Sequence, residues 1–238
     1  ATAGGRVDRH GSLDDKATFR IAPVVRIPET GTRLKAAYGT GFRAPALFEL
    51  YGFTINNFGG VFSGNPNLEP EESRGYEAGF EQSVFESRVR FGSLYFNNHI
   101  KNLIACGFTT CTNLRQADTW GAESFIAADL TDRIEARVDY TFTRVEDATK
   151  QFVGALTRRP KHKVDMEVVY RPTREAQVSL GAAYTGPATD VDFNTGGAAY
   201  KGGYTLFNLA GSYQLSDRWE MFSRIVNLFN RQYEVADG

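Results

Sequence analysis

Few side chains in this chain have the types and the spacing that catalysis requires. The 3 histidines are His10, His99 and His162, and each stands alone in its segment. No Gly-x-Ser-x-Gly or His-Glu-x-x-His motif is present. Ser93 and His99 lie too far apart along one expected strand to act as a nucleophile and base. The sequence therefore predicts that the protein is not an enzyme.

A glycine motif that could suggest a nucleotide site does not have the required context. Residues Gly39–Ala44 match the pattern G-x-G-x-x-A, but Pro45 and a long loop follow. A true dinucleotide fingerprint opens a crossover helix towards a parallel strand. The glycines are better explained as positions where a strand bends at a rim.

Two cysteines, Cys106 and Cys111, occur in the loop-like stretch CGFTTC. They could be buried thiols or part of a metal site, but no histidine lies nearby to complete zinc coordination. In an oxidising compartment a disulfide is favoured, and a ring this short would stiffen a loop tip.

A second candidate site is a set of oxygen ligands in the stretch 189–196. Asp190, Asp192 and Asn194 could contribute to a partial Ca²⁺ site, or they could form a solvated acidic turn. An EF-hand is excluded because Thr195 and Lys201 occupy the positions of its required Gly and Glu. We therefore expect no cofactor other than this loop Ca²⁺.

The composition limits the class of protein. Of the 238 residues, 42% are hydrophobic, 13% aromatic and 23% charged, which is typical of a folded chain. With 27 basic and 28 acidic residues the net charge is −1, so nothing favours nucleic acid as a partner. No apolar run approaches the roughly 18 residues of a spanning helix.

Most of the chain alternates between apolar and polar residues with the period of two that defines a β-strand. The clearest segment is Ile134–Arg144, and the same pattern recurs at 73–83, 163–170 and 177–184. The other face carries charges of both signs in mid-strand, as a wet lumen would allow. The charged residues expected to line it are Arg137, Asp139, Asp165 and Glu167.

Connections between these segments alternate between short and long. The expected short turns are Ile27–Thr32, Val84–Ser87, Leu130–Arg133, Arg171–Glu175 and Gln214–Arg218. The expected long links are His10–Asp15, Thr40–Glu71, His99–Asn113, Val145–Pro160 and Gly186–Gly203. Bacterial outer-membrane barrels have short periplasmic turns and long extracellular loops.

The strand pattern predicts an all-β, antiparallel, up-and-down transmembrane β-barrel wall. It contains about eleven strands, half of a 22-stranded barrel of the plugged-transporter class. Aromatic residues near strand ends are expected to form membrane-interface girdles. They are Tyr38, Tyr140, Tyr170, Tyr184, Tyr213 and Trp219.

Three motifs resemble the TonB-dependent outer-membrane receptor family. They are Tyr38–Tyr51 (YGTGFRAPALFELY), Asn65–Glu72 (NPNLEPEE) and Val226–Glu234 (VNLFNRQYE), the last similar to the penultimate strand and the loop after it. The resemblance covers essentially all of residues 1–238, which we expect to be a single-domain C-terminal barrel fragment. The family's N-terminal plug, its TonB box and its final strand have no counterpart here.

Within that family the chain is most similar to the vitamin B12 (cobalamin) receptors. The residues that carry this are Leu156–Lys163 (LTRRPKHK), Ala183–Gly186 (AYTG) and Asn227–Glu234. The resemblance implies a receptor in the bacterial outer membrane, in contact with its lipid. It would import a bulky metal chelate, preferably a corrinoid, with energy from the TonB complex acting through the absent N-terminal region. The alternatives are a ferric-siderophore receptor, a passive porin and, least favoured, a soluble β-sandwich.

Two long links are the candidates for ligand contact. An aromatic and glycine-rich loop could fold over a large amphipathic ligand, or its aromatics could pack on one another. The candidates in the link Thr40–Glu71 are Tyr51, Phe53, Asn56, Asn57, Phe58 and Phe62. Those in the link Gly186–Gly203 are Asp190, Asp192, Phe193 and Tyr200.

Overall fold

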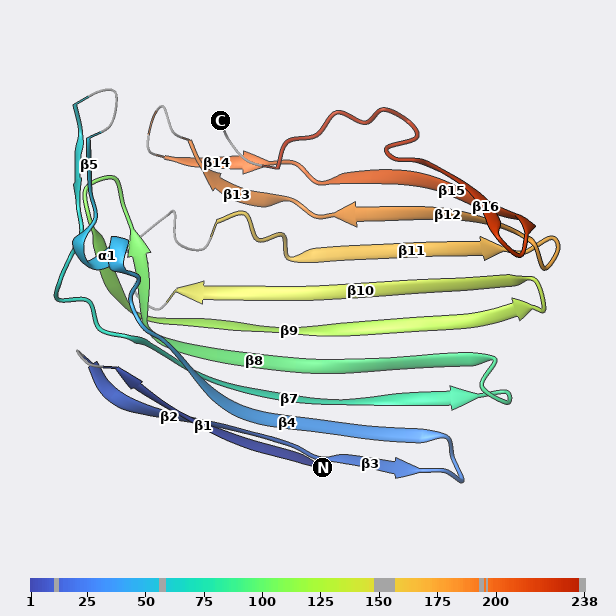
Figure 1. The fold of residues 1–238 in the computed structure, drawn as a ribbon, viewed down its shortest axis with the longest axis horizontal. Helices are drawn as coiled ribbons and strands as arrows, with labels where there is room; N and C mark the ends of the chain where they lie inside the picture. Colours follow the sequence, from blue (N-terminus) through green and yellow to red (C-terminus); the bar gives the residue numbers. More distant parts are fainter. Residues whose placement is uncertain (11–12, 56–58, 148–156, 193–194, 196, 236–238) are drawn as a thin grey trace.

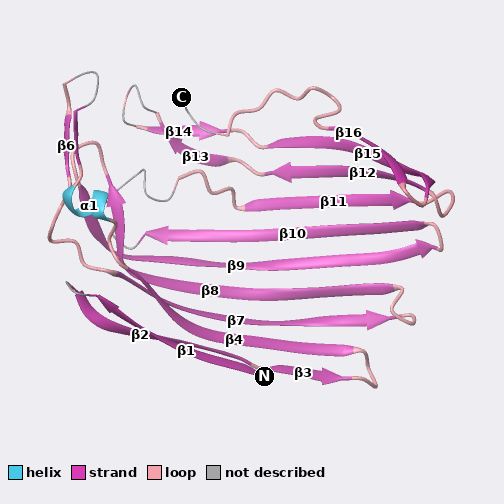
Figure 2. Cartoon of the chain, viewed as in Figure 1, coloured by secondary structure: helices cyan, strands magenta, loops and turns pink. Residues whose placement is uncertain are grey.

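The computed structural model describes residues 1–238 except 11–12, 56–58, 148–156, 193–194, 196 and 236–238 (Figure 1). Strands dominate it, and the described residues contain one short helix (Figure 2). The elements are β1 (Thr2–His10), β2 (Leu13–Ala22), β3 (Val24–Ile27), β4 (Thr32–Arg43), α1 (Leu47–Tyr51), β5 (Phe53–Ile55), β6 (Val61–Ser63), β7 (Glu71–Val84), β8 (Val89–Cys106), β9 (Cys111–Thr131), β10 (Ile134–Asp147), β11 (His162–Tyr170), β12 (Ala176–Thr185), β13 (Ala188–Val191), β14 (Ala198–Lys201), β15 (Tyr204–Ser216) and β16 (Trp219–Ile225).

Twelve of the strands form one antiparallel sheet. Its order is β1-β2-β4-β7-β8-β9-β10-β11-β12-β15-β16, with β3 also paired to β4. Both β2 and β3 pair with β4, on either side of Pro23, so they occupy one interrupted position. The 12 strands therefore fill eleven positions, because β2 and β3 share one. Neighbours in sequence are neighbours in the sheet, which confirms the predicted all-β, up-and-down wall.

The register places apolar residues opposite apolar residues and charged residues opposite charged ones. Across β10 and β11, Val138 faces Met166 on one side of the sheet, and Asp139 faces Asp165 on the other. The same two faces continue across β12, where Met166 lies opposite Ala182. The charged face holds the four residues predicted to line the lumen: Arg137, Asp139, Asp165 and Glu167.

The apolar face is exposed, and its aromatic side chains pack across strands. Phe80 contacts Phe91, with ring centroids 6.2 Å apart, and Tyr76 contacts Tyr95 at 6.1 Å. In water such a surface would be a large unfavourable patch, whereas lipid solvates it. All six residues predicted for the girdles are exposed large aromatics: Tyr38, Tyr140, Tyr170, Tyr184, Tyr213 and Trp219.

The turns after β3, β7, β9, β11 and β15 lie together at one end of the wall, and the longer connections after β4, β10 and β12 lie at the other (Figure 1). The turn between β3 and β4 shows why one position must be glycine. Gly31 has φ +69°, and a Cβ there would lie 2.6 Å from the carbonyl oxygen of Ser83. Any side chain at this position would strain the backbone and clash with the neighbouring strand.

Three predicted boundaries are wrong. Strand β1 runs to His10 and β2 starts at Leu13, so the first link is short where a long one was expected. Strands β8 and β9 extend to Cys106 and Cys111, so most of the link His99–Asn113 is a two-stranded ladder. These segments are rich in polar residues and do not alternate, so the sequence pattern did not indicate that the strands continue beyond their lipid-facing part. The last strand ends at Ile225, and the following motif residues leave the ladder.

Strands β8 and β9 contain 18 and 21 residues. A tilted transmembrane strand needs only about 9–11 residues. Both strands therefore project well beyond a bilayer at the long-loop end. Among the described residues, no helix has the length and apolar character to cross a membrane.

Candidate functional site

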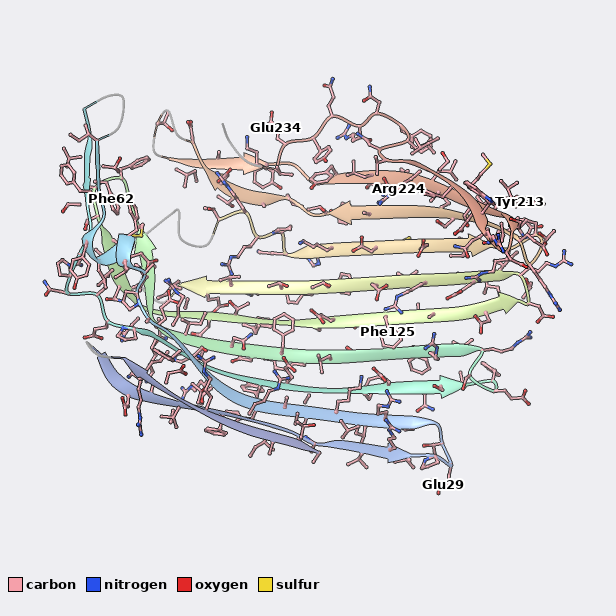
Figure 3. All side chains as sticks on the ribbon, in the orientation of Figure 1. Glu29, Phe62, Phe125, Tyr213, Arg224 and Glu234 are labelled. Atoms are coloured by element: carbon pink, nitrogen blue, oxygen red, sulfur yellow. A yellow bond between two sulfur atoms is a disulfide. The ribbon has the colours of Figure 1, made fainter. Side chains whose placement is uncertain are left out.

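The long-loop end contains a small core, formed mainly by the connection between β4 and β7. Phe62, Leu68 and Cys111 are buried there, with Leu50 and Ile104 packed against them. Figure 3 shows Phe62 at this end of the molecule, beside α1. Cys106 and Cys111 are joined by a disulfide at the tip of the β8–β9 ladder. The disulfide therefore forms part of the floor on which the loop packs.

The loop is tied to the strand ends by one arginine. Arg43, the last residue of β4, forms two hydrogen bonds of 2.8 Å to Glu71, the first residue of β7. A third nitrogen of Arg43 donates to Glu49 of α1 at 3.1 Å. The Glu71 carboxylate also accepts a hydrogen bond of 2.8 Å from the backbone N–H of Ile104. We call Arg43, Glu49 and Glu71 the rim anchor.

Electrostatics in the rim anchor favour the charged forms of both partners. Burial alone would raise the pKa of Glu71, but the hydrogen bonds from Arg43 and from the N–H of Ile104 outweigh it. The pKa of Glu71 is therefore lowered. The pKa of Arg43 is raised, chiefly by its hydrogen bond to Glu71. Both groups stay ionised at neutral pH and hold the two strand ends together.

The asparagine-rich motif before β7 completes the attachment. Asn65 donates to the carbonyl oxygen of Cys111 at 3.1 Å. Asn113 of β9 accepts from the N–H of Glu69 at 2.8 Å and donates back to the carbonyl oxygen of Glu69 at 2.9 Å. Asn102 adds a hydrogen bond of 2.7 Å to the Glu69 side chain. The motif residues thus have a structural role, since they fix the loop to the β8–β9 ladder.

On this fixed base the loop displays large apolar side chains. Tyr51 and Phe53 are 67% and 66% exposed, and Leu47 is 78% exposed. Phe62, by contrast, is 9% exposed and stacks on Phe48 with ring centroids 5.2 Å apart. We call the exposed side chains on α1 and β5 the apolar platform; they are Leu47, Phe48, Tyr51, Phe53 and Ile55.

The ligand-contact residues predicted from the sequence therefore separate into groups. Tyr51 and Phe53 are on the platform, whereas Phe62 lies in the loop core. Tyr200, on β14, is 75% exposed. The remaining candidates in these loops lie outside the described residues: Asn56, Asn57, Phe58, Phe193 and Asn194.

The carboxylates of the second loop bind protein groups. Asp190 is 1% exposed and accepts hydrogen bonds from Arg158 Nε at 2.8 Å and from the N–H of Val191 at 2.9 Å. Asp192 accepts from the Thr195 hydroxyl at 2.8 Å and caps the β13–β14 turn. In the part of the chain that the structure describes, no group of three or more His, Cys, Asp or Glu side chains could hold a metal. A Ca²⁺ ion at this loop stays a prediction.

The charged face of the sheet carries shallow grooves. One, of about 390 Å³, is lined by Lys35, Glu81, Glu123 and Arg137 among others. In it Arg137 bonds to Asp139 at 2.5 and 2.6 Å and lies over the Phe125 ring at 5.2 Å. Lys35 and Arg33 both pair with Glu81. Most of these charges neutralise one another within the wall.

Sequence reasoning missed the residues that hold the loop in place. Arg43, Glu49 and Glu71 belong to the motifs that carry the family resemblance, but the contact between Arg43 and Glu71 joins positions 28 residues apart. The available signal was that two of the motifs that resemble the receptor family flank one long loop. Two such motifs at the two ends of one loop could have been expected to contact each other, which would have suggested the ion pair between Arg43 and Glu71.

Comparisons with known proteins agree on one family. The family described as "TonB dependent receptor-like, beta-barrel" matches residues 1–228. The iron-regulated outer membrane virulence protein of Vibrio cholerae is 27% identical over 99% of this chain and 39% of its own length. The vitamin B12 transporter BtuB of Photobacterium profundum is 29% identical over 98% of this chain and 37% of its own.

Solved structures show the same fold. The ferric enterobactin receptor of Pseudomonas aeruginosa, in complex with enterobactin, superposes with a TM-score of 0.79 at 20% identity. The superposition covers 96% of this chain and 37% of the enterobactin receptor chain. The siderophore receptor PirA of the same species gives a TM-score of 0.75 at 18% identity, over 97% and 40%. The chain thus spans about two fifths of the relatives' length.

Proposed function

Because this chain belongs to the TonB-dependent receptor β-barrel family and lies in the bacterial outer membrane, we propose that it forms part of the wall of a receptor that takes up a bulky metal chelate. Residues 1–238 would be the C-terminal part of that barrel. The receptor's role is capture and passage of the ligand, without catalysis.

The observation that carries this proposal is the apolar platform on a rigid base. Exposed apolar side chains in a contiguous segment mark binding surfaces more often than chance. Here Tyr51 and Phe53 are exposed while the loop beneath them is fixed by Arg43 and Glu71. Preorganisation of this kind lowers the entropy cost of binding. A large ligand with an apolar face would gain most from such a surface.

A corrinoid is our first candidate for the ligand. The vitamin B12 transporter of Photobacterium profundum is 29% identical to this chain, and the motifs 156–163 and 183–186 support the same choice. A ferric siderophore is the second candidate. It is favoured by the 27% identity with an iron-regulated protein of Vibrio cholerae and by the siderophore receptors with similar folds.

The mechanism follows from the two faces of the wall. The loops would capture the ligand, the charged face would line its route, and a separate plug, opened by TonB, would act as the gate. Arg137 pairs with Asp139 in its own strand, so these two charges neutralise each other on the charged face. On β11, Asp165 lies opposite Asp139 and Glu167 lies opposite Arg137. These two carboxylates would be available to contact a plug.

The test is ligand binding by a full-length receptor that carries this chain, in detergent. It is titrated with cyanocobalamin and, separately, with a panel of ferric siderophores, each with and without Ca²⁺. The variant Tyr51→Ala/Phe53→Ala is compared with Phe85→Ala, which removes an aromatic side chain that is 75% exposed at the short-turn end.

We expect nanomolar to micromolar cyanocobalamin binding that the double variant weakens by roughly tenfold or more, since each buried aromatic contributes on the order of 1 kcal/mol or more. The Phe85→Ala control should bind as the wild type does. Binding to a siderophore alone would replace the corrinoid with the second candidate. Binding unaffected by Tyr51→Ala/Phe53→Ala would refute the platform as the capture surface.

A further inference from the structure

A charged hollow lies on the opposite side of the wall from the lumen, on the face that carries the exposed aromatics. It has a volume of about 300 Å³, and its lining includes Lys16, Glu72, Arg74, His99 and Lys101. Tyr38 lies opposite Tyr76 on the apolar face, and Thr40 lies opposite Arg74 one step further along the same face. This hollow therefore faces lipid, where a ligand in the lumen cannot reach it.

Its depth in the membrane follows from the register. Arg74 lies two residues beyond Tyr76 on β7, and Lys101, on β8, lies opposite Glu72, two residues further still. With a rise of about 3.4 Å per residue and a tilt near 45°, these cations lie roughly 5 and 10 Å outside the tyrosine level. The headgroup layer extends about 5–7 Å beyond the hydrocarbon on each side, so Arg74 lies within it and Lys101 lies near its outer edge. Because the hollow is at the long-loop end, that layer is the outer leaflet.

The charges in the hollow leave two cations without a protein partner. Glu72 pairs with Lys16 at 2.5 Å. Asp118, on β9, is held by His99 at 2.6 Å. The neighbouring carboxylate on β10, Glu146, pairs with Arg144 at 2.8 Å. Among the described residues, Arg74 and Lys101 form neither an ion pair nor a side-chain hydrogen bond, and both are exposed.

We propose that Arg74 and Lys101 form a binding site for the phosphate of a phosphorylated glycolipid headgroup in the outer leaflet. An arginine matches phosphate geometry with a planar fork, and a lysine adds a mobile point charge. Tyr38 and Tyr76 lie directly below the cations and can pack against the acyl chains of the same lipid. Basic residues at a membrane surface strengthen contact with anionic lipid. The site would fix the height of the barrel in an asymmetric membrane, independently of the transported ligand.

The experiment uses the full-length receptor in detergent, titrated by native mass spectrometry with diphosphorylated lipid A. Dephosphorylated lipid A and inorganic phosphate are titrated in parallel, to separate a lipid site from a free-phosphate site. The test variant is Arg74→Gln/Lys101→Gln. The matched control is Arg133→Gln/Arg174→Gln, which removes two exposed cations from the short turns β9–β10 and β11–β12 at the opposite end of the wall.

We expect the test variant to bind diphosphorylated lipid A about 30-fold more weakly than wild type, since each cation contributes about fivefold at an anionic surface. The control variant should bind as the wild type does, and the wild type should bind dephosphorylated lipid A as weakly as the test variant binds the phosphorylated form. The proposal would be overturned if both variants lost lipid A affinity equally, or if neither lost any. It would also be overturned if the receptor bound inorganic phosphate but not lipid A. Chelate binding by Arg74→Gln/Lys101→Gln should be unchanged, which separates this site from the proposed transport function.

Discussion

Replacing Glu71 by glutamine should loosen the rim anchor while leaving the barrel wall intact. The carboxylate accepts two hydrogen bonds of 2.8 Å from Arg43 and one from the N–H of Ile104. Glutamine has the same shape but carries no charge, and its nitrogen would face a guanidinium nitrogen. The charge attraction and at least one hydrogen bond are therefore lost.

The magnitude depends on how well solvent screens the pair. The side chain of Glu71 is 14% exposed and that of Arg43 is 46% exposed. A charge-assisted hydrogen bond contributes on the order of 1.5–3 kcal/mol when shielded, and an exposed ion pair contributes less than about 1 kcal/mol. For this half-shielded pair we expect a loss of roughly 1–2 kcal/mol. That corresponds to a five- to thirtyfold increase in local opening.

Hydrogen–deuterium exchange on the full-length receptor measures this opening directly. In Glu71→Gln, the segments 44–70 and 102–113 should exchange five- to thirtyfold faster, while β10–β12 stay protected. The matched control is Glu81→Gln on the same strand, which breaks the pairs with Lys35 and Arg33 nearer the short turns. Unchanged exchange in Glu71→Gln, or equal loosening of segment 44–70 in Glu81→Gln, would refute the reasoning.

Three further predictions concern the same end of the molecule. The pKa of Glu71 is lowered, so its contribution to the stability of the rim anchor is complete above about pH 4.3 and is lost as the pH falls through the lowered value. Pepsin should therefore cut the segment 44–70 faster as the pH falls in wild type, whereas Glu71→Gln should show no such step. Phe62→Ala should destabilise the loop core by about 3 kcal/mol, seen as faster exchange of α1, while Leu47→Ala, on an exposed side chain, should not. Arg158→Met removes the guanidinium that faces the buried carboxylate of Asp190 and should loosen β13–β14 by roughly 2–3 kcal/mol. Restoration of exchange protection by Ca²⁺ in that variant would support the predicted calcium site, and no effect of Ca²⁺ would argue against it.

The sequence determined the wall. An apolar–polar period of two has a direct physical cause, since each strand contacts lipid on one face and water on the other. That cause acts residue by residue, so the alternation at 134–144 could be read without knowing its neighbours. The short turns could be found for the same reason, because they are the brief breaks between segments that alternate. The motifs at 38–51 and 65–72 were enough to indicate the family.

Tertiary structure decided the arrangement of the rim. Phe62 and Phe53 are both phenylalanines in the same loop, yet Phe62 is buried and Phe53 is exposed. Asp190 reads as a solvated acidic residue but is buried against Arg158. These outcomes depend on contacts between residues 28 to 46 positions apart, such as Arg43 with Glu71 and Asn65 with Cys111. Local sequence patterns do not predict such pairings, because the pairings arise only when the strand register brings distant segments together.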